Sequence, residues 1–414
     1  MSGSSIREEV IQMQVLTNTK FETVAFQWPN GFYSDGIHIG LRRHKKDFGW
    51  LFSKVPASAA GTYTTNQFQA APTKLTKQMI DHNHQLQGLL LNSAIANSCT
   101  GAQGWQNALQ EQTWLANKLA VAPDLIGVAS TGLIGAQLPM DKIQNGLPQL
   151  TPTKSDAVTY AVLTTDKHPK TVCVQCELSG HLVTLTGFAK GSGMIHPKMA
   201  TMLGFVTTDA QVDGDVLQSM LSTNVDSTFN QITVDGDTST NDMVVTMANG
   251  LADNPSLEAG TTDYDIFNQA LHYVLGQLAK QIAADGEGAT KLVECNVTHA
   301  ASDDDGQKIA KAIVGSNLVK AAIFGEDPNW GRIISTIGAT DADIDIDTVD
   351  IEMNGIPLVQ DSLAVDFDLA AVQGTLHDSQ IMIDVDLHHG AASGQAWGCD
   401  LTYNYVKINA SYHT

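Results

Sequence analysis

Cysteine is scarce in this sequence, with five residues in a chain of 414, and this odd, sparse set does not indicate a disulfide framework. Cys173 and Cys176 form a C-x-x-C pair without a second pair or a flanking histidine. The pair lies in a segment of strand character, where residues three apart face opposite sides and cannot easily share a metal ion. We therefore expect reduced core cysteines, a reducing compartment and no metal site.

Basic residues are also few, because 23 Lys and Arg stand against 44 Asp and Glu, which gives a net charge of −21. Such a charge repels phosphate backbones and argues against nucleic acid as a partner. No apolar run approaches the ~20 residues of a membrane span. The start of the chain lacks the basic and apolar regions of a secretory signal. These absences predict a cytoplasmic protein that contacts neither nucleic acid nor membrane.

The sequence contains no internal repeats, low-complexity segments or Pro/Ser-rich linker. Its length suggests one large or two ordinary domains, and its 43% of hydrophobic residues suffice for a sizeable core. Apolar residues at helical spacing predict helices over residues 102–119 and 262–285. Short apolar runs predict strands, among them 88–93, 126–130, 158–163, 171–176 and 204–210.

The most distinctive stretch runs from Lys190 to Gly204, near the middle of the chain. Gly191 and Gly193 permit a tight loop, and Pro197 then fixes one backbone angle. Small and apolar residues follow and enclose Thr201. Composition alone favours the interpretation that Thr201 is a buried β-branched residue at the start of a strand. The alternative is that Thr201 is a nucleophile.

A threonine nucleophile needs an adjacent base, and an N-terminal threonine obtains one from its own α-amine. The reference pKa of such an amine is about 7.7–8.0, so much of it is neutral near physiological pH. Thr201 would acquire this amine only if the chain is cut between Ala200 and Thr201. In that reaction the Thr201 hydroxyl would attack the Ala200 carbonyl, and water would hydrolyse the resulting ester.

This stretch resembles the signature of the ornithine acetyltransferase (glutamate N-acetyltransferase), or ArgJ, family of arginine biosynthesis. There the segment reads close to Lys-Gly-Ser-Gly-Met-Ile-x-Pro-x-Met-Ala-Thr-Met-Leu, and all its fixed positions are kept here. Further matches extend from about Gly31 to the end. The resemblance implies that Thr201 is the nucleophile, and that the chain cleaves itself into an α chain of residues 1–200 and a β chain of residues 201–414.

The resemblance also implies roles for residues of other motifs. Thr131 and Gly132, within Ser-Thr-Gly-Leu-Ile-Gly, would form the oxyanion hole, although the residues alone indicate only a glycine turn. The substrate-binding residues that it implies are Thr164 (or Thr165), Lys190, Thr201, Glu287, Asn409 and Thr414. Without the resemblance, these would be a strand-end cap, a solvated lysine, a loop glutamate and tail residues. Ser411 and His413 depart from the family's tail, as Gln231 departs from an internal motif.

Asp235 and Asp237 flank a glycine within one of these motifs, which raises the question of calcium. The EF-hand pattern is not met, because no glutamate follows at the required spacing. We expect a hydrogen-bonded turn near the active site and no metal.

The resemblance implies a layered α/β fold in two subdomains, with sheets flanked by helices in an N-terminal-nucleophile-like (DmpA/ArgJ-like) architecture. It implies an α2β2 heterotetramer that moves acetyl from N-acetyl-L-ornithine to L-glutamate by a ping-pong reaction through a Thr201 acetyl-enzyme. No cofactor is expected, and the sequence leaves open acetyl-CoA as a second donor. Two alternatives remain: an amide or peptide hydrolase of the same fold with an N-terminal threonine nucleophile, and a non-catalytic binding or structural protein.

Overall fold

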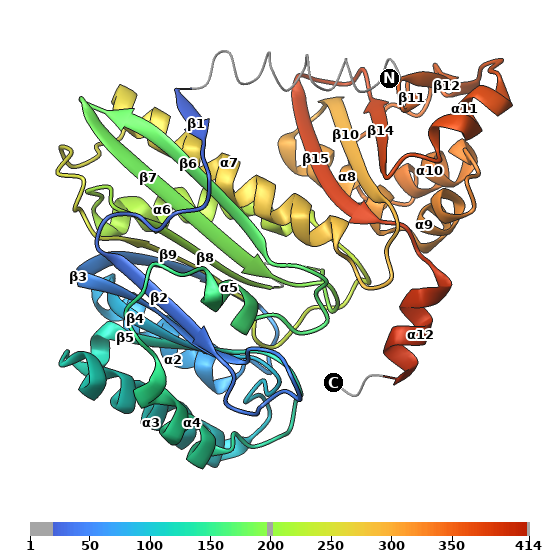
Figure 1. The fold of residues 1–414 in the computed structure, drawn as a ribbon. Helices are drawn as coiled ribbons and strands as arrows, with labels where there is room; N and C mark the ends of the chain where they lie inside the picture. Colours follow the sequence, from blue (N-terminus) through green and yellow to red (C-terminus); the bar gives the residue numbers. More distant parts are fainter. Residues whose placement is uncertain (1–19, 197–201, 412–414) are drawn as a thin grey trace.

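The protein folds around two β-sheets in a computed structural model that describes residues 20–196 and 202–411 (Figure 1). The first sheet has the strand order β1-β6-β7-β8-β9-β3-β4-β5, with β2 paired to β3. Its strands are β1 (Phe21–Thr23), β2 (Phe32–Ile37), β3 (Phe48–Tyr63), β4 (Gln85–Asn92), β5 (Ile126–Ser130), β6 (Lys170–Leu178), β7 (His181–Lys190), β8 (Leu203–Thr208) and β9 (Met243–Ala248).

Helices pack on both sides of this sheet and bury its strands. The helices are α2 (Ala71–Asn83), α3 (Gly101–Leu119), α4 (Met140–Gly146), α5 (Ala157–Ala161), α6 (Gly214–Asp226) and α7 (Thr262–Ala284). The long helix α7 runs along β6 and β7 (Figure 1), where Leu271, Val274 and Leu278 enter a core shared with α6. Helices α2 and α3 pack near β4 and β5 instead, through Leu75 and Leu115.

The second sheet follows α7 in the chain and has its own core. Its order is β13-β12-β11-β14-β10-β15, from β10 (Leu292–Ala300), β11 (Asp350–Met353), β12 (Ile356–Gln360), β13 (Leu363–Ala364), β14 (Gln380–Asp386) and β15 (Ala392–Cys399). Its helices are α8 (Asp303–Gly315), α9 (Asn317–Phe324), α10 (Trp330–Ile337), α11 (Leu369–Thr375) and α12 (Tyr403–Ser411). The predicted layered α/β fold in two subdomains is therefore confirmed.

The boundary between the two sheets differs from the predicted chain boundary at residues 200 and 201. Strand β8 follows that boundary, yet it pairs with β7 on one side and with β9 on the other. Strand β9 in turn pairs with β3. A cut before residue 201 would therefore leave two chains joined through one continuous hydrogen-bonded sheet.

One predicted strand is wrong, because residues 158–163 begin in the short helix α5 (Ala157–Ala161). The hydroxyl of Ser155 accepts a hydrogen bond from the Ala157 N–H and starts this turn. Val158 and Val162 are then buried beside β2 and β3. Short apolar runs do not distinguish a buried helix from a buried strand.

Two predicted helices and the two buried cysteines agree with the fold. The helices predicted over 102–119 and 262–285 correspond to α3 and α7. Cys173 and Cys176 are buried on β6 as free thiols, and burial raises the pKa of both. Within residues 20–196 and 202–411, no helix is both long and apolar enough to cross a membrane.

Candidate functional site

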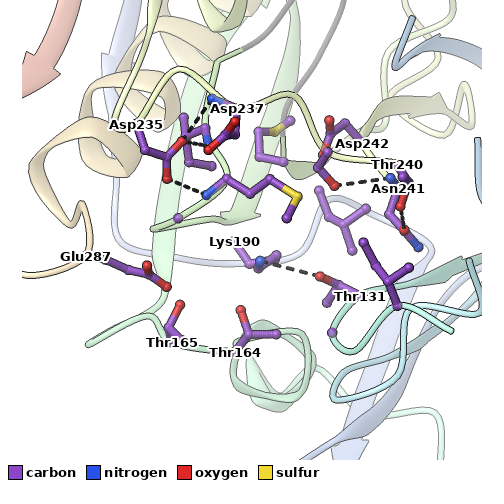
Figure 2. A pocket seen from close by; sticks show the side chains of 18 of the residues that line it. Thr131, Thr164, Thr165, Lys190, Asp235, Asp237, Thr240, Asn241, Asp242 and Glu287 are labelled. Carbon is purple, nitrogen blue, oxygen red and sulfur yellow. Dashed lines mark hydrogen bonds between the residues drawn. The ribbon is translucent and has the colours of Figure 1, made fainter. Parts of the chain in front are cut away.

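A cavity of about 220 Å³ lies where the ends of β5 and β7 meet the start of the second sheet (Figure 2). Seven separate stretches of the chain form its walls. Among the lining residues are six that the sequence predicted for the site: Thr131, Gly132, Thr164, Lys190, Glu287 and Asn409. Folding thus brings together residues that are up to 278 positions apart (409 − 131).

Three predicted site residues, Ala200, Thr201 and Thr414, lie outside the described residues. Met202 and Leu203 line the cavity, directly after Thr201 in the chain. The role of Thr201 as nucleophile stays a prediction.

The turn after β5 holds Thr131 and Gly132 in a conformation that only glycine fits. Gly132 has φ +130°, and a Cβ there would lie 2.1 Å from the backbone carbonyl carbon of Ala94. The Thr131 N–H donates to the Asn92 carbonyl at 3.1 Å. The Asn241 side chain supports the turn by donating to the Ser130 carbonyl at 2.8 Å. Glycine is therefore required at position 132 for a structural reason, and the turn presents polar groups to the cavity.

Lys190 ends β7 as a buried cation in the cavity wall, with Nζ 3.5 Å from the hydroxyl oxygen of Thr131 (Figure 2). Burial lowers the pKa of Lys190, while the charges of Asp166, Asp242 and Glu287 act in the opposite direction. Asp242 is itself buried, and its pKa lies well above the usual range for that reason. The cavity therefore offers a lysine that suits an anionic substrate group.

Glu287 approaches the cavity from the loop after α7, opposite the glycine-rich loop. Its N–H donates to the Ser192 carbonyl at 2.7 Å, and a Cβ on Gly193 would lie 2.4 Å from the Glu287 carboxyl group. Gly193 thus leaves room for the carboxylate. Asn409 of α12 donates to Glu287 Oε2 at 2.8 Å, so the C-terminal helix reaches the same cavity.

A buried ion-pair triad lies behind the cavity, and sequence reasoning missed it. Lys170 Nζ is 2.5 Å from Asp166 Oδ1 and 2.5 Å from Asp285 Oδ2, with all three side chains fully buried. Burial alone would raise the pKa of Asp166, but the charges of Lys170 and Lys190 outweigh it and hold that pKa below its usual range. The three triad residues lie within the Thr-Thr-Asp, Pro-Lys and Asp-Gly-Glu-Gly motifs. Their place in those motifs was the sequence signal that could have identified them.

The triad positions three of the cavity's walls. Asp166 accepts hydrogen bonds from the Gly191 N–H at 2.7 Å and from the Thr164 N–H at 2.9 Å. Asp285, two residues before Glu287, accepts from the Lys167 N–H at 3.0 Å. Its three side chains therefore connect the threonine turn, the glycine-rich loop and the glutamate loop.

Arg42 also supports the threonine turn and was not predicted. Its guanidinium donates to the Leu163 carbonyl at 2.5 Å and to the Thr164 carbonyl at 2.7 Å. Thr165, next to Thr164, bonds through its hydroxyl to Ser192 at 2.6 Å. Both threonines line the cavity, so the geometry alone does not separate their predicted roles.

Asp235 forms a hydrogen-bonded turn beside the cavity, as predicted. Its carboxylate accepts from the backbone N–H groups of Met194 at 2.7 Å, Ile195 at 2.9 Å and Asp237 at 3.2 Å (Figure 2). These bonds fasten the glycine-rich loop before residue 197. Tyr405 of α12 lies near Asp235 and lines the cavity as well, a contact that no sequence pattern indicated.

Comparison with known proteins places nearly the whole chain in one family. The sequence profile of the ArgJ family matches residues 33–414. The arginine biosynthesis bifunctional protein ArgJ of Lactiplantibacillus plantarum is 92% identical over 402 residues, which are 97% of this chain and 100% of that protein. The protein of the same name from Streptococcus thermophilus is 51% identical over 387 residues, covering 93% of this chain and 98% of that one.

A solved structure agrees with the sequence comparisons. The crystal structure of the arginine biosynthesis bifunctional protein ArgJ from Bacillus halodurans matches with 51% identity and a TM-score of 0.50. The match covers 50% of this chain and 98% of the solved one. The resemblance seen in the glycine-rich stretch is confirmed over nearly the full length: this chain belongs to the ArgJ family.

Proposed function

We propose that this chain moves the acetyl group of N-acetyl-L-ornithine to L-glutamate through an acetyl ester on Thr201. The chain is an acetyltransferase of arginine biosynthesis that acts on small molecules, as its near-complete match to ArgJ proteins shows. The comparisons do not favour the alternative of an amide or peptide hydrolase. The observation that carries the proposed mechanism is the convergence of six motif residues on one cavity that Met202, the residue after Thr201 in the chain, also lines.

The proposed reaction has two balanced halves. The Thr201 hydroxyl attacks the acetyl carbonyl of N-acetylornithine while the Thr201 α-amine takes its proton. The tetrahedral intermediate collapses, the C–N bond breaks, and the proton passes to the departing amine of ornithine. Glutamate then enters with a neutral amine, attacks the acetyl ester and leaves as N-acetylglutamate, which returns the hydroxyl to Thr201.

The cavity offers a suitable partner for each charged part of these substrates. We assign the developing oxyanion to Thr131 and Gly132, since their turn faces the cavity beside Lys190. Lys190 would bind a substrate carboxylate. Glu287 would hold the δ-ammonium of ornithine, with Asn409 orienting its carboxylate through the 2.8 Å hydrogen bond. Thr164 and Thr414 complete the proposed substrate contacts.

The α-amine of Thr201 would come from self-cleavage after Ala200, which we propose as the maturation step. The solved Bacillus halodurans chain corresponds to half of this chain, a length compatible with such a cut. The continuous sheet through β7, β8 and β9 would hold the α and β chains together after the cut. We further propose that the two chains assemble as an α2β2 heterotetramer in the cytoplasm.

No cofactor enters this exchange, because both donor and acceptor bring their own reacting groups. Acetyl-CoA remains a second donor in the proposal, since its thioester could acetylate the same hydroxyl. The relatives are named bifunctional, which supports testing it.

The direct test is an acetyl-exchange assay on the purified full-length chain. N-acetyl-L-ornithine carrying a ¹³C-labelled acetyl group is mixed with L-glutamate, and mass spectrometry follows the label. Labelled N-acetylglutamate and parallel double-reciprocal plots are expected. Release of labelled acetate at a rate independent of glutamate would instead identify a hydrolase. Acetyl-CoA replaces the donor in a second arm.

The variant Gly132→Ala is expected to lower kcat for exchange by roughly 10²–10³-fold, because the added Cβ displaces an oxyanion donor. The clash is with backbone atoms of Ala94, so no side-chain rotation can relieve it. Steady-state kinetics measure the effect. Gly374→Ala is the control, because a Cβ at that position meets nothing within 4 Å. Unchanged kcat in Gly132→Ala would remove this turn from the proposed mechanism.

A further inference from the structure

Three adjacent strands of the second sheet place a group of metal-binding side chains at one sheet end. Asp386 ends β14, where it pairs with Thr298 of the parallel strand β10 and with Asp350 of the antiparallel strand β11. His299 follows Thr298, and His388 follows Asp386 by two residues. Figure 1 shows β10 and β14 side by side in this part of the molecule. Sheet register therefore brings these groups together from segments far apart in sequence.

The distances among these side chains approach those of a metal site. One ligand atom from each of His299, Asp386 and His388 lies within 4.8 Å of the others. Asp386 Oδ1 is 2.8 Å from His299 Nδ1 and 3.5 Å from His388 Nδ1. Ligands of a tetrahedral zinc ion, bound at about 2.0–2.1 Å, are roughly 3.3 Å apart. The His299–Asp386 pair would need to open by about half an ångström, whereas the His388–Asp386 pair already has nearly this spacing.

A fourth side chain orients one of the two imidazoles. Asp350 Oδ2 lies 2.9 Å from His388 Nε2, on the ring nitrogen opposite to the one that faces Asp386. Metal-bound histidines commonly donate their second N–H to a carboxylate, which fixes the tautomer and the ring direction. The Asp350–His388 pair has this arrangement.

The backbone holds the two histidines in place. His299 and His388 have φ values of 52° and 47°, in the left-handed region that non-glycine residues seldom occupy. The His299 carbonyl accepts hydrogen bonds from the N–H groups of His389 at 2.9 Å and Gly390 at 2.8 Å. The His388 N–H donates to Asp386 Oδ1 at 2.9 Å. The loop after β14 is thus fastened to the end of β10.

We propose that His299, Asp386 and His388 form a binding site for one divalent transition-metal ion of the zinc class, with Asp350 as the positioning residue. Two imidazoles and one carboxylate are ligands that zinc, nickel and copper accept, and the exposed side of the group leaves room for water. A bound ion would join the ends of β10 and β14 and would be balanced by the two carboxylates.

This site is separate from the catalytic cavity. Strand β10 starts at Leu292, close to Glu287, and carries the chain roughly 23 Å away to His299. The cavity and the proposed metal site share no residue. The metal site therefore neither depends on the proposed acetyl transfer nor supports it, and each can fail alone.

Calorimetric titration of ZnCl₂ into the untagged full-length protein at pH 7.5 tests the site. One ion per chain is expected, with affinity at least tenfold weaker in His299→Ala and in His388→Ala. Asp350→Asn keeps all three ligands and should weaken binding by roughly 10–100-fold. His377→Ala is the control, because His377 is exposed and pairs with Glu326 at 3.0 Å.

A spectroscopic readout separates a defined site from loose surface binding. Cu²⁺ bound to the intact protein should show two-nitrogen coupling in electron paramagnetic resonance, reduced to one nitrogen in either histidine variant. Far-ultraviolet circular dichroism verifies that the variants are folded. Absence of saturable binding, or equal affinity in the intact protein and in both histidine variants, would overturn the proposal. The cluster would then consist of His–Asp ion pairs without a metal-binding role.

Discussion

Replacing Thr201 with alanine is expected to leave the chain uncut and to slow acetyl exchange by at least ~10⁴-fold, because loss of the nucleophile alone can lower kcat by about 10⁶-fold. One hydroxyl is proposed to perform both reactions, first on the Ala200 carbonyl and later on the acetyl group. Intact-mass spectrometry should find a single 44.2 kDa species for the variant. The unchanged sequence should give two fragments that meet between residues 200 and 201.

Two further variants give this experiment its controls. Thr201→Ser keeps a hydroxyl and an α-amine after cleavage, so it should be cut and should retain part of the exchange activity. Thr113→Ala removes an exposed threonine hydroxyl on α3 that bonds only within its helix, to the Leu109 carbonyl at 2.8 Å, and should be cut and active. Cleavage or full exchange activity in Thr201→Ala would contradict the nucleophile assignment. This conclusion does not depend on the result of the zinc-binding experiment.

The predicted cavity residues could be named because each belongs to a motif that resembles one of the family. Gly132 is an example: the structure requires glycine there, since φ is +130° and Ala94 occupies the space of a Cβ. Glu287 is another, since the neighbouring glycines mark a sharp turn. The motifs named the residues, but only the fold shows that they share a cavity.

The supporting contacts could not be predicted because they depend on long-range packing. Arg42 bonds to carbonyl groups more than 120 positions away, at Leu163 and Thr164, and no local pattern encodes such a pair. The strand predicted at 158–163 failed for a related reason. Burial on several sides makes a short apolar helix and a strand look alike in sequence, whereas α3 and α7 are long enough for their spacing to be decisive.

The buried triad yields the second large effect. Lys170→Met is expected to lower the free energy of unfolding by about 3–5 kcal/mol, because two fully buried carboxylates lose the cation between them. Urea denaturation followed by tryptophan fluorescence measures the change. Lys77→Met is the matched control, since the Lys77–Asp81 pair is about half exposed and should contribute at most ~1 kcal/mol.

The pH dependence of this loss tests its electrostatic origin. In the unchanged protein the pKa of Asp166 lies below that of the unfolded chain, so the unfolded state binds more protons as pH falls. Its stabilisation is therefore present above about pH 4 and lost in more acidic solution. Without Lys170, burial becomes the stronger influence and the pKa of Asp166 should rise above its unfolded value.

The loss in the free energy of unfolding caused by Lys170→Met should then be smaller at pH 5 than at pH 8, because a protonated Asp166 carboxyl does not need the lysine charge. An equal deficit at both pH values would indicate that Lys170 acts through packing rather than through its charge. Because Asp166 also holds Gly191 and Thr164, the charge explanation further requires that the variant's exchange activity, taken relative to the unchanged protein at the same pH, recovers together with its stability at pH 5.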